Sequence, residues 1–521
     1  MPAAEAPPRP RSTATIPLAG TGDGLTEVAD ALARAVGGAQ AAQRPAGPLP
    51  AGAPHDVLGA VTSRLGPAVV PATGIGADAA LHRVAKLLVE QGINLTHPFA
   101  AAHLQPPPLA VAVAADALAG ASNASQDTYD SGPAGIAVER WLVAALAGLA
   151  GFGAEADGVL TPGGSLSNLM AVMFARDSVA RRLGVDVRAD GVAALGTPVV
   201  FCSELAHFST HRACAVLGLG ESAVRAVPVD ADRRMRPDAL VEMLAELDSG
   251  EIPLAVVATA GTTDFGSVDP LPEIAEIARE HGMWFHADAA YGFGALFSDR
   301  LAPRVAGLEL ADSITVDLHK IGWQPSAASV LLVSDGTAFS SLERQVDYLN
   351  PADDGEQGYD GLLGVSLQTT RRPDAVKVAT TLLAYGREGL GRMLDTCHDL
   401  ARHAETRILG DPELELVAGA NLTTVVFRYR GTAAEACLDE LNGTLRRELL
   451  RSGRALLGRT SAFVDGPGAP SVTCLKFTLL NPNAGVADID ALLDLVVTTG
   501  RELATRPCTR TDADAHQEGA A

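Results

Sequence analysis

The chain has 521 residues, enough for two or three folded units around a large core. Its 62 acidic and 40 basic residues give a formal net charge of −22, which argues against nucleic acid or an anionic membrane surface as a partner. The six cysteines show no CxxC spacing and no clustering with histidine, and no apolar run resembles a secretion signal or a membrane span, so we expect reduced thiols, no metal site and a cytoplasmic protein.

The first part of the chain is predicted to divide into a tail and an arm. Residues 1–50 are rich in Pro, Ala, Gly and Arg with little periodicity, so we expect a disordered tail. Residues 51–110 are predicted to form an N-terminal arm followed by a proline-rich loop. Within the arm, residues 77–91 carry apolar side chains at helical spacing, and Gly92 stands where that helix would stop.

Residues 111–385 are predicted to form a large domain. From Gly158 to about Leu332, short β-rich runs alternate with helical runs, which favours an α/β fold with a mostly parallel sheet covered by helices on both faces. A long helix with a break near residues 386–389 then leads into a smaller α/β domain, residues 386–506. Residues 507–521 are polar, and we expect a second disordered tail.

Two charged side chains stand at the carboxyl ends of predicted strands, where ligands bind in such sheets. Asp288 lies in the apolar run HADAAYG (286–292), and Lys320 follows the strand-like run DSITVDLH (312–319). A pyridoxal 5'-phosphate site needs a lysine to condense with the aldehyde and a carboxylate to keep the pyridine nitrogen protonated. The pair therefore predicts a site for this cofactor, although a capping aspartate and a solvated lysine would explain the two residues taken alone.

The residues around this pair carry a family resemblance. HADAAYG followed by DSITVDLHKIGWQP (312–325) resembles the group II pyridoxal-phosphate decarboxylases, which act on aromatic amino acids, glutamate, 2,4-diaminobutyrate or lysine. The similarity runs from about Asn94 to about Val497. It implies a fold-type I architecture like that of aspartate aminotransferase, pyridoxal 5'-phosphate as cofactor, and a homodimer with its sites at the subunit interface.

The resemblance also implies which residues hold the cofactor. It assigns the phosphate to Gly164 and Ser165, which precede a helical run. Free N–H groups at a helix N-terminus suit a phosphate, although a plain capped turn is an equal explanation of the stretch alone. It places His207 against the cofactor ring as a catalytic side chain, and it places Thr263 and His319 beside the cofactor.

The remaining implied roles concern the substrate. Tyr348, in an acidic and glycine-rich stretch predicted to be a mobile lid, would return a proton to the α-carbon after CO2 leaves. Arg371 would hold the substrate carboxylate, because a guanidinium fork suits a planar anion. His103 would line the pocket, unless its loop has no function. Lys476 stands where glutamate decarboxylases carry an arginine, so it is a further substrate candidate. Asp317 replaces the asparagine of many relatives, which puts a phosphate contact there in doubt.

The sequence thus predicts decarboxylation of an L-amino acid to the amine and CO2. Residues 348–351, 366–372 and 386–389 resemble the siderophore-pathway enzymes, so lysine or 2,4-diaminobutyrate is the expected substrate, in secondary metabolism. Glutamate, aspartate or an aromatic amino acid remains an alternative substrate. Decarboxylation-dependent oxidative deamination is an alternative reaction, and a cofactor-free partner protein is an alternative of another class.

Overall fold

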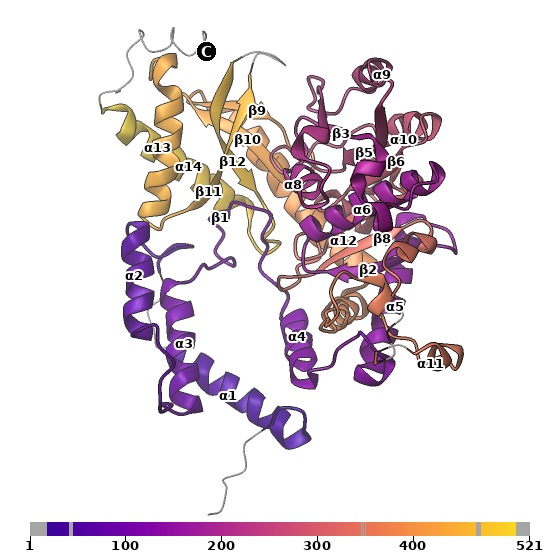
Figure 1. Cartoon of the computed structure of the whole chain (residues 1–521). Coiled ribbons are helices and arrows are strands. Elements are labelled where there is room, and N and C mark those ends of the chain that lie inside the picture. The colour runs from indigo at the N-terminus through magenta and orange to yellow at the C-terminus, as the bar shows by residue number, and fades with distance from the viewer. Residues whose placement is uncertain are drawn as a thin grey trace, which may run out of the picture.

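A computed structural model describes residues 18–40, 45–344, 346, 348–349, 351–464 and 470–506. Figure 1 shows three parts: a helical arm at the N-terminus, a large domain around a central sheet, and a small C-terminal domain beside it. The predicted tail at 507–521 lies outside the described residues.

The large domain is built on a seven-stranded sheet of order β2-β8-β7-β6-β5-β3-β4. All neighbouring strands from β7 to β4 pair in parallel, while β8 is antiparallel to both β7 and β2. The predicted mostly parallel sheet is therefore confirmed. The strands are β2 (Asp157–Thr161), β3 (Thr197–Ser203), β4 (Val224–Val227), β5 (Glu251–Thr259), β6 (Trp284–Asp288), β7 (Ser313–Asp317) and β8 (Ser329–Val333).

Helices cover both faces of this sheet, because successive strand residues point to opposite sides. On β5, Val256 belongs to the core cluster beneath α5, α9, α10 and α12, whereas Val257 belongs to the cluster beneath α6 and α8. The helices of this domain are α4 (Ala110–Ser122), α5 (Pro133–Ala150), α6 (Gly164–Arg182), α7 (Val187–Asp190), α8 (Ser209–Val216), α9 (Pro237–Ala245), α10 (Leu271–Glu280), α11 (Ala352–Glu356) and α12 (Ala375–Leu409).

Strands β6 and β7 carry polar residues at every second position. Trp284, His286 and Asp288 share one face of β6, and the register sets His286 opposite Ser313 and Asp288 opposite Thr315 on β7. The residues between them, such as Phe285 and Ala287, belong to the apolar core on the other face. Two strands thus present a polar row to one side of the sheet, and this row ends at the sheet's carboxyl edge.

The small domain holds a five-stranded sheet of order β1-β11-β12-β10-β9, which packs against α13, α14 and the C-terminal half of α12. Its outermost strand, β1, comes from the segment before the large domain and pairs in parallel with β11. The elements are β1 (Ala100–Ala101), β9 (Leu414–Ala418), β10 (Thr424–Tyr429), β11 (Leu456–Phe463), β12 (Ser471–Thr478), α13 (Leu438–Arg451) and α14 (Val486–Ala504).

Helix α12 joins the two domains and is interrupted at Gly386, as the sequence predicts. Gly386 has φ 61° and ψ 179°, a conformation that a residue with a side chain rarely adopts.

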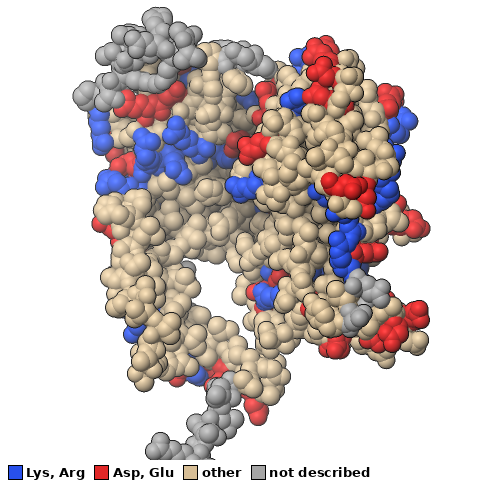
Figure 2. Space-filling model, in the orientation of Figure 1, with Lys and Arg blue, Asp and Glu red and all other residues tan. Residues whose placement is uncertain are grey.

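The arm consists of α1 (Gly22–Gln40), α2 (Pro54–Leu65) and α3 (Ala77–Gln91). The predicted disordered tail is wrong for residues 22–40, because α1 places Leu25, Leu32 and Ala35 at helical spacing and packs against α3, where Arg34 pairs with Asp78 at 3.0 Å. Residues 1–17 and 41–44 lie outside the described part of the chain. In Figure 2 the arm stands away from the body and its visible surface carries few charges.

Helix α5 is the one described helix that is long and apolar enough to cross a membrane by length and composition. Its Leu142 and Leu146 are buried in the core of the large domain, and a core helix passes the same test.

Four cysteines, Cys202, Cys214, Cys397 and Cys474, are free and buried. Burial raises the pKa of each thiol to about 12. Cys437 is disulfide-bonded, so the expectation of reduced thiols is wrong for that residue.

Candidate active site

A cavity of about 290 Å³ lies at the carboxyl ends of β6 and β7, under the N-terminus of α6. Seven of the residues predicted from the sequence line it together: Gly164, Ser165, His207, Thr263, Asp288, His319 and Lys320. The acid and the lysine of the sequence prediction therefore face one cavity, from the ends of neighbouring strands. Other lining residues include Asn168, Asp317 and Tyr291.

The N-terminus of α6 forms one wall of the cavity. Gly163 and Gly164 follow β2 after Pro162, and a Cβ added at Gly163 would meet nothing within 4 Å. A Cβ at Gly164 would lie 3.0 Å from both carboxylate oxygens of Asp317, so a side chain there would crowd this wall. The nineteen-residue helix places free N–H groups and the positive end of its dipole at the cavity, an arrangement that binds phosphate.

Asp288 ends β6 and is 6% exposed. Its Oδ2 accepts a hydrogen bond from Asn168 Nδ2 at 2.8 Å, and its Oδ1 accepts one from the Ala290 N–H at 3.2 Å. Both carboxylate oxygens are therefore oriented by donors. A carboxylate fixed in this way can hold a cationic ring nitrogen of a ligand in the cavity.

His207 lies between β3 and α8 and lines the cavity. Its Nδ1 is 2.8 Å from Ser209 Oγ and 3.3 Å from the Ser209 N–H. Burial lowers the pKa of His207, against the opposing effect of the Asp288 charge. A neutral imidazole held by Ser209 can stack on a flat ring without adding a positive charge.

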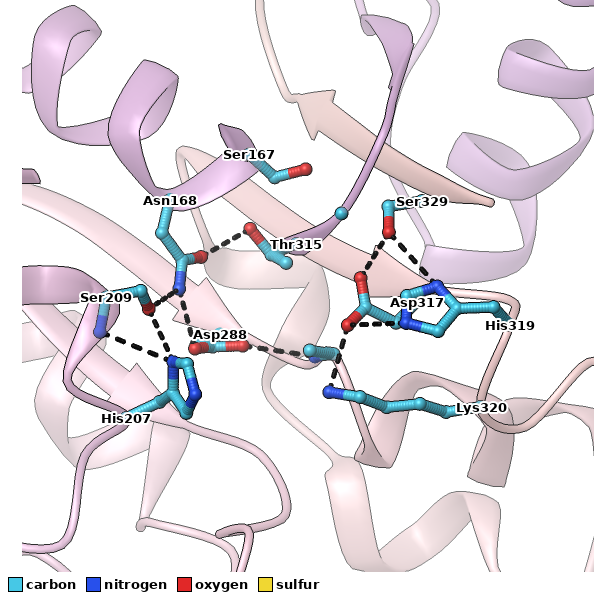
Figure 3. A network of polar contacts seen from close by, with 12 residues as sticks. Ser167, Asn168, His207, Ser209, Asp288, Thr315, Asp317, His319, Lys320 and Ser329 are labelled. Atoms are coloured by element: carbon cyan, nitrogen blue, oxygen red, sulfur yellow. Dashed lines mark hydrogen bonds and ion pairs between the residues drawn. The ribbon is translucent and has the colours of Figure 1, made fainter. Parts of the chain in front are cut away.

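Lys320 and Asp317 form the second polar group of the cavity, on the right in Figure 3. Lys320 Nζ lies 2.9 Å from Asp317 Oδ2, and Ser329 Oγ donates to Asp317 Oδ1 at 2.5 Å. His319 Nε2 is 3.8 Å from Asp317 Oδ2, while its Nδ1 is 3.1 Å from the Ala328 carbonyl oxygen. Asp317 is therefore the counterion of Lys320, a role that the sequence did not suggest.

Arg371 does not reach the cavity, which corrects the prediction that it holds the substrate. Its Nη1 donates to Glu139 Oε1 at 2.7 Å and to the Leu160 carbonyl oxygen at 3.3 Å. The Leu160 N–H in turn donates to the same Glu139 oxygen at 3.1 Å. Because β2 is an edge strand, its outer backbone groups need partners, and this buried ion pair supplies them at Leu160.

Lys476 and His103 also lie outside the cavity lining. Lys476 Nζ, on β12, donates to the Thr263 carbonyl oxygen at 3.1 Å and to Asp264 Oδ1 at 2.6 Å, so its charge is already paired. His103 lies at the surface, and the pKa of its imidazole is lowered by partial desolvation of the ring and by the charges of Lys476 and Arg446. Lys476 therefore contacts the backbone of Thr263 in the cavity wall. Neither Lys476 nor His103 lines the cavity itself.

Tyr348 is the fourth predicted residue that the chain does not bring to the cavity. Its side chain is 83% exposed and is absent from the cavity lining. Gln345, Asp347 and Asn350 on either side of it lie outside the described residues.

The sequence reasoning missed several side chains that hold the site together. Asn168, Ser209 and Thr315 form a buried hydrogen-bonded group with Asp288 and His207, on the left in Figure 3. Both ends of the Asn168 amide are used inside the protein, since Nδ2 donates to Asp288 and Oδ1 accepts from Thr315. The alternation of polar and apolar residues in WFHAD (284–288) and SITVD (313–317) was the available signal.

Comparison with known proteins decides the family. The model of the pyridoxal-dependent decarboxylase conserved domain matches residues 74–430. The chain belongs to the pyridoxal-dependent decarboxylase family. It is 40% identical over 441 residues to an L-2,4-diaminobutyrate decarboxylase of Rhizobium meliloti (strain 1021), with 84% of each chain covered. It is 36% identical over 436 residues to a protein of the same name from Acinetobacter baumannii, with 81% of this chain and 84% of the relative covered.

Solved structures of decarboxylases share the fold. The glutamate decarboxylase domain of a Vibrio parahaemolyticus diaminobutyrate-pyruvate transaminase and L-2,4-diaminobutyrate decarboxylase superposes with a TM-score of 0.81 at 33% identity, covering 92% of this chain and 97% of that one. Oryza sativa TDC with PLP and tryptamine superposes with a TM-score of 0.81 at 25% identity, over the same shares of the two chains. The expected fold-type I architecture and the carboxy-lyase class are thereby confirmed.

The residues present fit pyridoxal 5'-phosphate. Bound there, the cofactor supplies a ring that draws electrons from the bond being broken. Lys320 is the amine that could bond its aldehyde carbon, and Asp288 would hold a proton at the ring nitrogen. Gly164 and Ser165 would bind the phosphate at the α6 N-terminus, and His207 would orient the ring. Asp317, beside Lys320, can hold the proton that the lysine gains or gives up.

Proposed function

We propose that this decarboxylase acts on an L-diamino acid, with L-2,4-diaminobutyrate as the preferred substrate, and that it serves secondary metabolism in the cytoplasm. The observation that carries the proposal is the 40% identity over 84% of both chains to a protein with that named activity. The lid residues Asp353 and Asp354 add support, because they are exposed carboxylates that can meet the distal ammonium of a diamino acid.

The substrate is tested by identifying products by mass after separate incubations with 2,4-diaminobutyrate, lysine, ornithine, glutamate, aspartate and tyrosine. We expect 1,3-diaminopropane and one CO2 per 2,4-diaminobutyrate consumed, with slower turnover of lysine and ornithine. The D-enantiomer of 2,4-diaminobutyrate is the matched control and should give no amine. Turnover of glutamate or tyrosine alone, or release of an aldehyde and ammonia, would overturn the proposed substrate or reaction.

We also infer that the working unit is a homodimer in which each chain's Tyr348 serves the partner's cavity. Tyr348 is exposed and lies outside its own chain's cavity, although the family resemblance makes it the proton donor. The arm and the adjoining α4 carry exposed apolar side chains, as interaction surfaces do. These side chains are Leu32, Val36, Leu58, Leu65, Leu81, Val84, Leu88, Val113 and Leu118.

The shared site is tested with mixed dimers of Lys320→Ala and Tyr348→Phe chains that carry two different purification tags. Each parent dimer should form almost no amine, since one lacks the lysine and the other the proton donor. In a mixed dimer, one cavity combines Lys320 of one chain with Tyr348 of the other, so half of the wild-type amine formation per dimer is expected. A mixed dimer that forms no amine, or a protein that is monomeric by light scattering, would contradict the inference.

A further inference from the structure

A row of hydrogen-bonded polar side chains leads from the cavity into the large domain. Trp284 and His286 on β6 contact Ser313 on β7, and His286 contacts Asn168 on α6. His286 and Asn168 are 1% and 2% exposed. A buried donor or acceptor left without a partner is destabilising, so each proton along this row must face an acceptor.

The two ends of the row fix its direction. An indole N–H can only donate, and Trp284 Nε1 donates to Ser313 Oγ at 2.8 Å. Asp288 Oδ2 accepts a hydrogen bond at the other end, so the nitrogen of the Asn168 amide must face it, at 2.8 Å. Asn168 Oδ1 then points away from Asp288 and accepts the Thr315 hydroxyl proton at 2.7 Å.

The same logic places the single proton of His286. Burial lowers the pKa of His286 to about 4, so the ring is neutral. Its Nε2 is 3.1 Å from Asn168 Oδ1, which can only accept, and therefore Nε2 carries the proton. Nδ1 then accepts from the Ser313 hydroxyl at 2.8 Å. The Ser313 carbonyl, 3.1 Å from Nδ1, would favour a proton there, but two lone pairs would then face each other at Asn168.

A branch of the row reaches His207. The second hydrogen on Asn168 Nδ2 points to Ser209 Oγ at 2.8 Å, so this oxygen uses its own proton on His207 Nδ1, also at 2.8 Å. The Ser209 backbone N–H points to the same ring nitrogen. Nδ1 is thus an acceptor, and the proton of the neutral His207 ring lies on Nε2.

We propose that Asn168 is a positioning residue that orients the Asp288 carboxylate and, through Ser209, fixes the tautomer of His207. Its one amide nitrogen supplies both hydrogen bonds, and its oxygen is held by Thr315 and His286 so that the amide cannot turn over. The inference rests on the decarboxylase function and on its cofactor, but not on which amino acid is the substrate.

The test measures the Kd of pyridoxal 5'-phosphate for the full-length apoprotein by fluorescence quenching at a series of pH values. The compared quantity is the ratio of the variant's Kd to the wild-type Kd at each pH. Asn168→Asp removes both donors and sets a carboxylate against that of Asp288. At low pH the two carboxyl groups in contact share one proton, and this proton takes the place of the lost amide hydrogen. Rising pH removes it, and two negative charges then face each other. The ratio should therefore climb with pH, by on the order of tenfold or more. Asn168→Ala should raise the ratio at every pH, without this dependence.

Asn442→Asp is the matched control, because Asn442 is fully buried in the small domain, where Nδ2 donates to the carbonyls of Tyr429 and Leu438. It should lower the melting temperature and leave the pH dependence of Kd unchanged. Ser209→Ala breaks only the His207 branch and should raise Kd equally at all pH values. A pH-independent ratio for folded Asn168→Asp, or unchanged Kd in Ser209→Ala, overturns the proposal. The assay contains no amino acid, so its outcome is separate from that of the substrate test.

Discussion

Replacing Lys320 with alanine is expected to lower amine formation by at least about 10³-fold, because covalent catalysis then has no amine to carry it. The chain has four lysines, at positions 86, 320, 377 and 476, and among the residues that line the cavity Lys320 is the one lysine. Lys476 approaches the cavity wall but is bound to Asp264 and the Thr263 carbonyl, so it cannot substitute. Product mass after incubation with the amino acid measures the loss.

Lys86→Ala is the control for this variant, since Lys86 lies half-exposed on the arm and should retain wild-type turnover. Borohydride reduction in the presence of the cofactor gives a second measurement that needs no substrate. In wild-type protein it should label the peptide containing Lys320, and in Lys320→Ala no peptide should be labelled. Retained turnover, or labelling of another lysine, would show that the attachment site has been misassigned.

Replacing Arg371 with methionine is expected to lower the free energy of unfolding by about 3–5 kcal/mol, the cost of leaving a buried charge without its partner. Arg371 and Glu139 are 6% and 1% exposed, and their contacts also satisfy both backbone groups of Leu160 on the edge strand β2. Urea unfolding at a fixed protein concentration measures the change.

Two further variants separate charge from packing at this position. Adding Glu139→Gln to Arg371→Met removes the unpaired charge and keeps an acceptor for the Leu160 N–H, so part of the stability should return. Arg372→Met breaks the half-exposed pair with Asp116 and should cost no more than about 1 kcal/mol. If Arg371→Met raises KM strongly and leaves the free energy of unfolding unchanged, Arg371 contacts the substrate after all.

Where a site residue follows a strand end or a helix start, the sequence was sufficient to place it. Asp288 and Lys320 were found in this way, because strand register carries them to one edge of the sheet, whereas Gly164 was assigned by the family resemblance. The break at Gly386 was also found, because glycine interrupts a helical pattern.

Residues whose roles depend on packing between distant segments were not placed. Arg371 resembled a substrate arginine in its motif, but Glu139, far away in the sequence, takes its charge. Helix α1 was hidden by a composition rich in alanine and glycine, although its apolar spacing is helical. Asp317 was seen as a poor phosphate ligand, and only the folded chain shows its contact with Lys320.

The pairing of β1 with β11 has a consequence for how the chain is made. Ala100 pairs with Leu456, so the small-domain sheet joins two segments between which the whole large domain is synthesised. Closing so long a loop is entropically costly, which makes the pairing of β1 with β11 a late step of folding, whereas β9 to β12 lie close together in the sequence. A fragment that begins at residue 386 would lack β1 and expose the edge of β11. An exposed strand edge promotes aggregation.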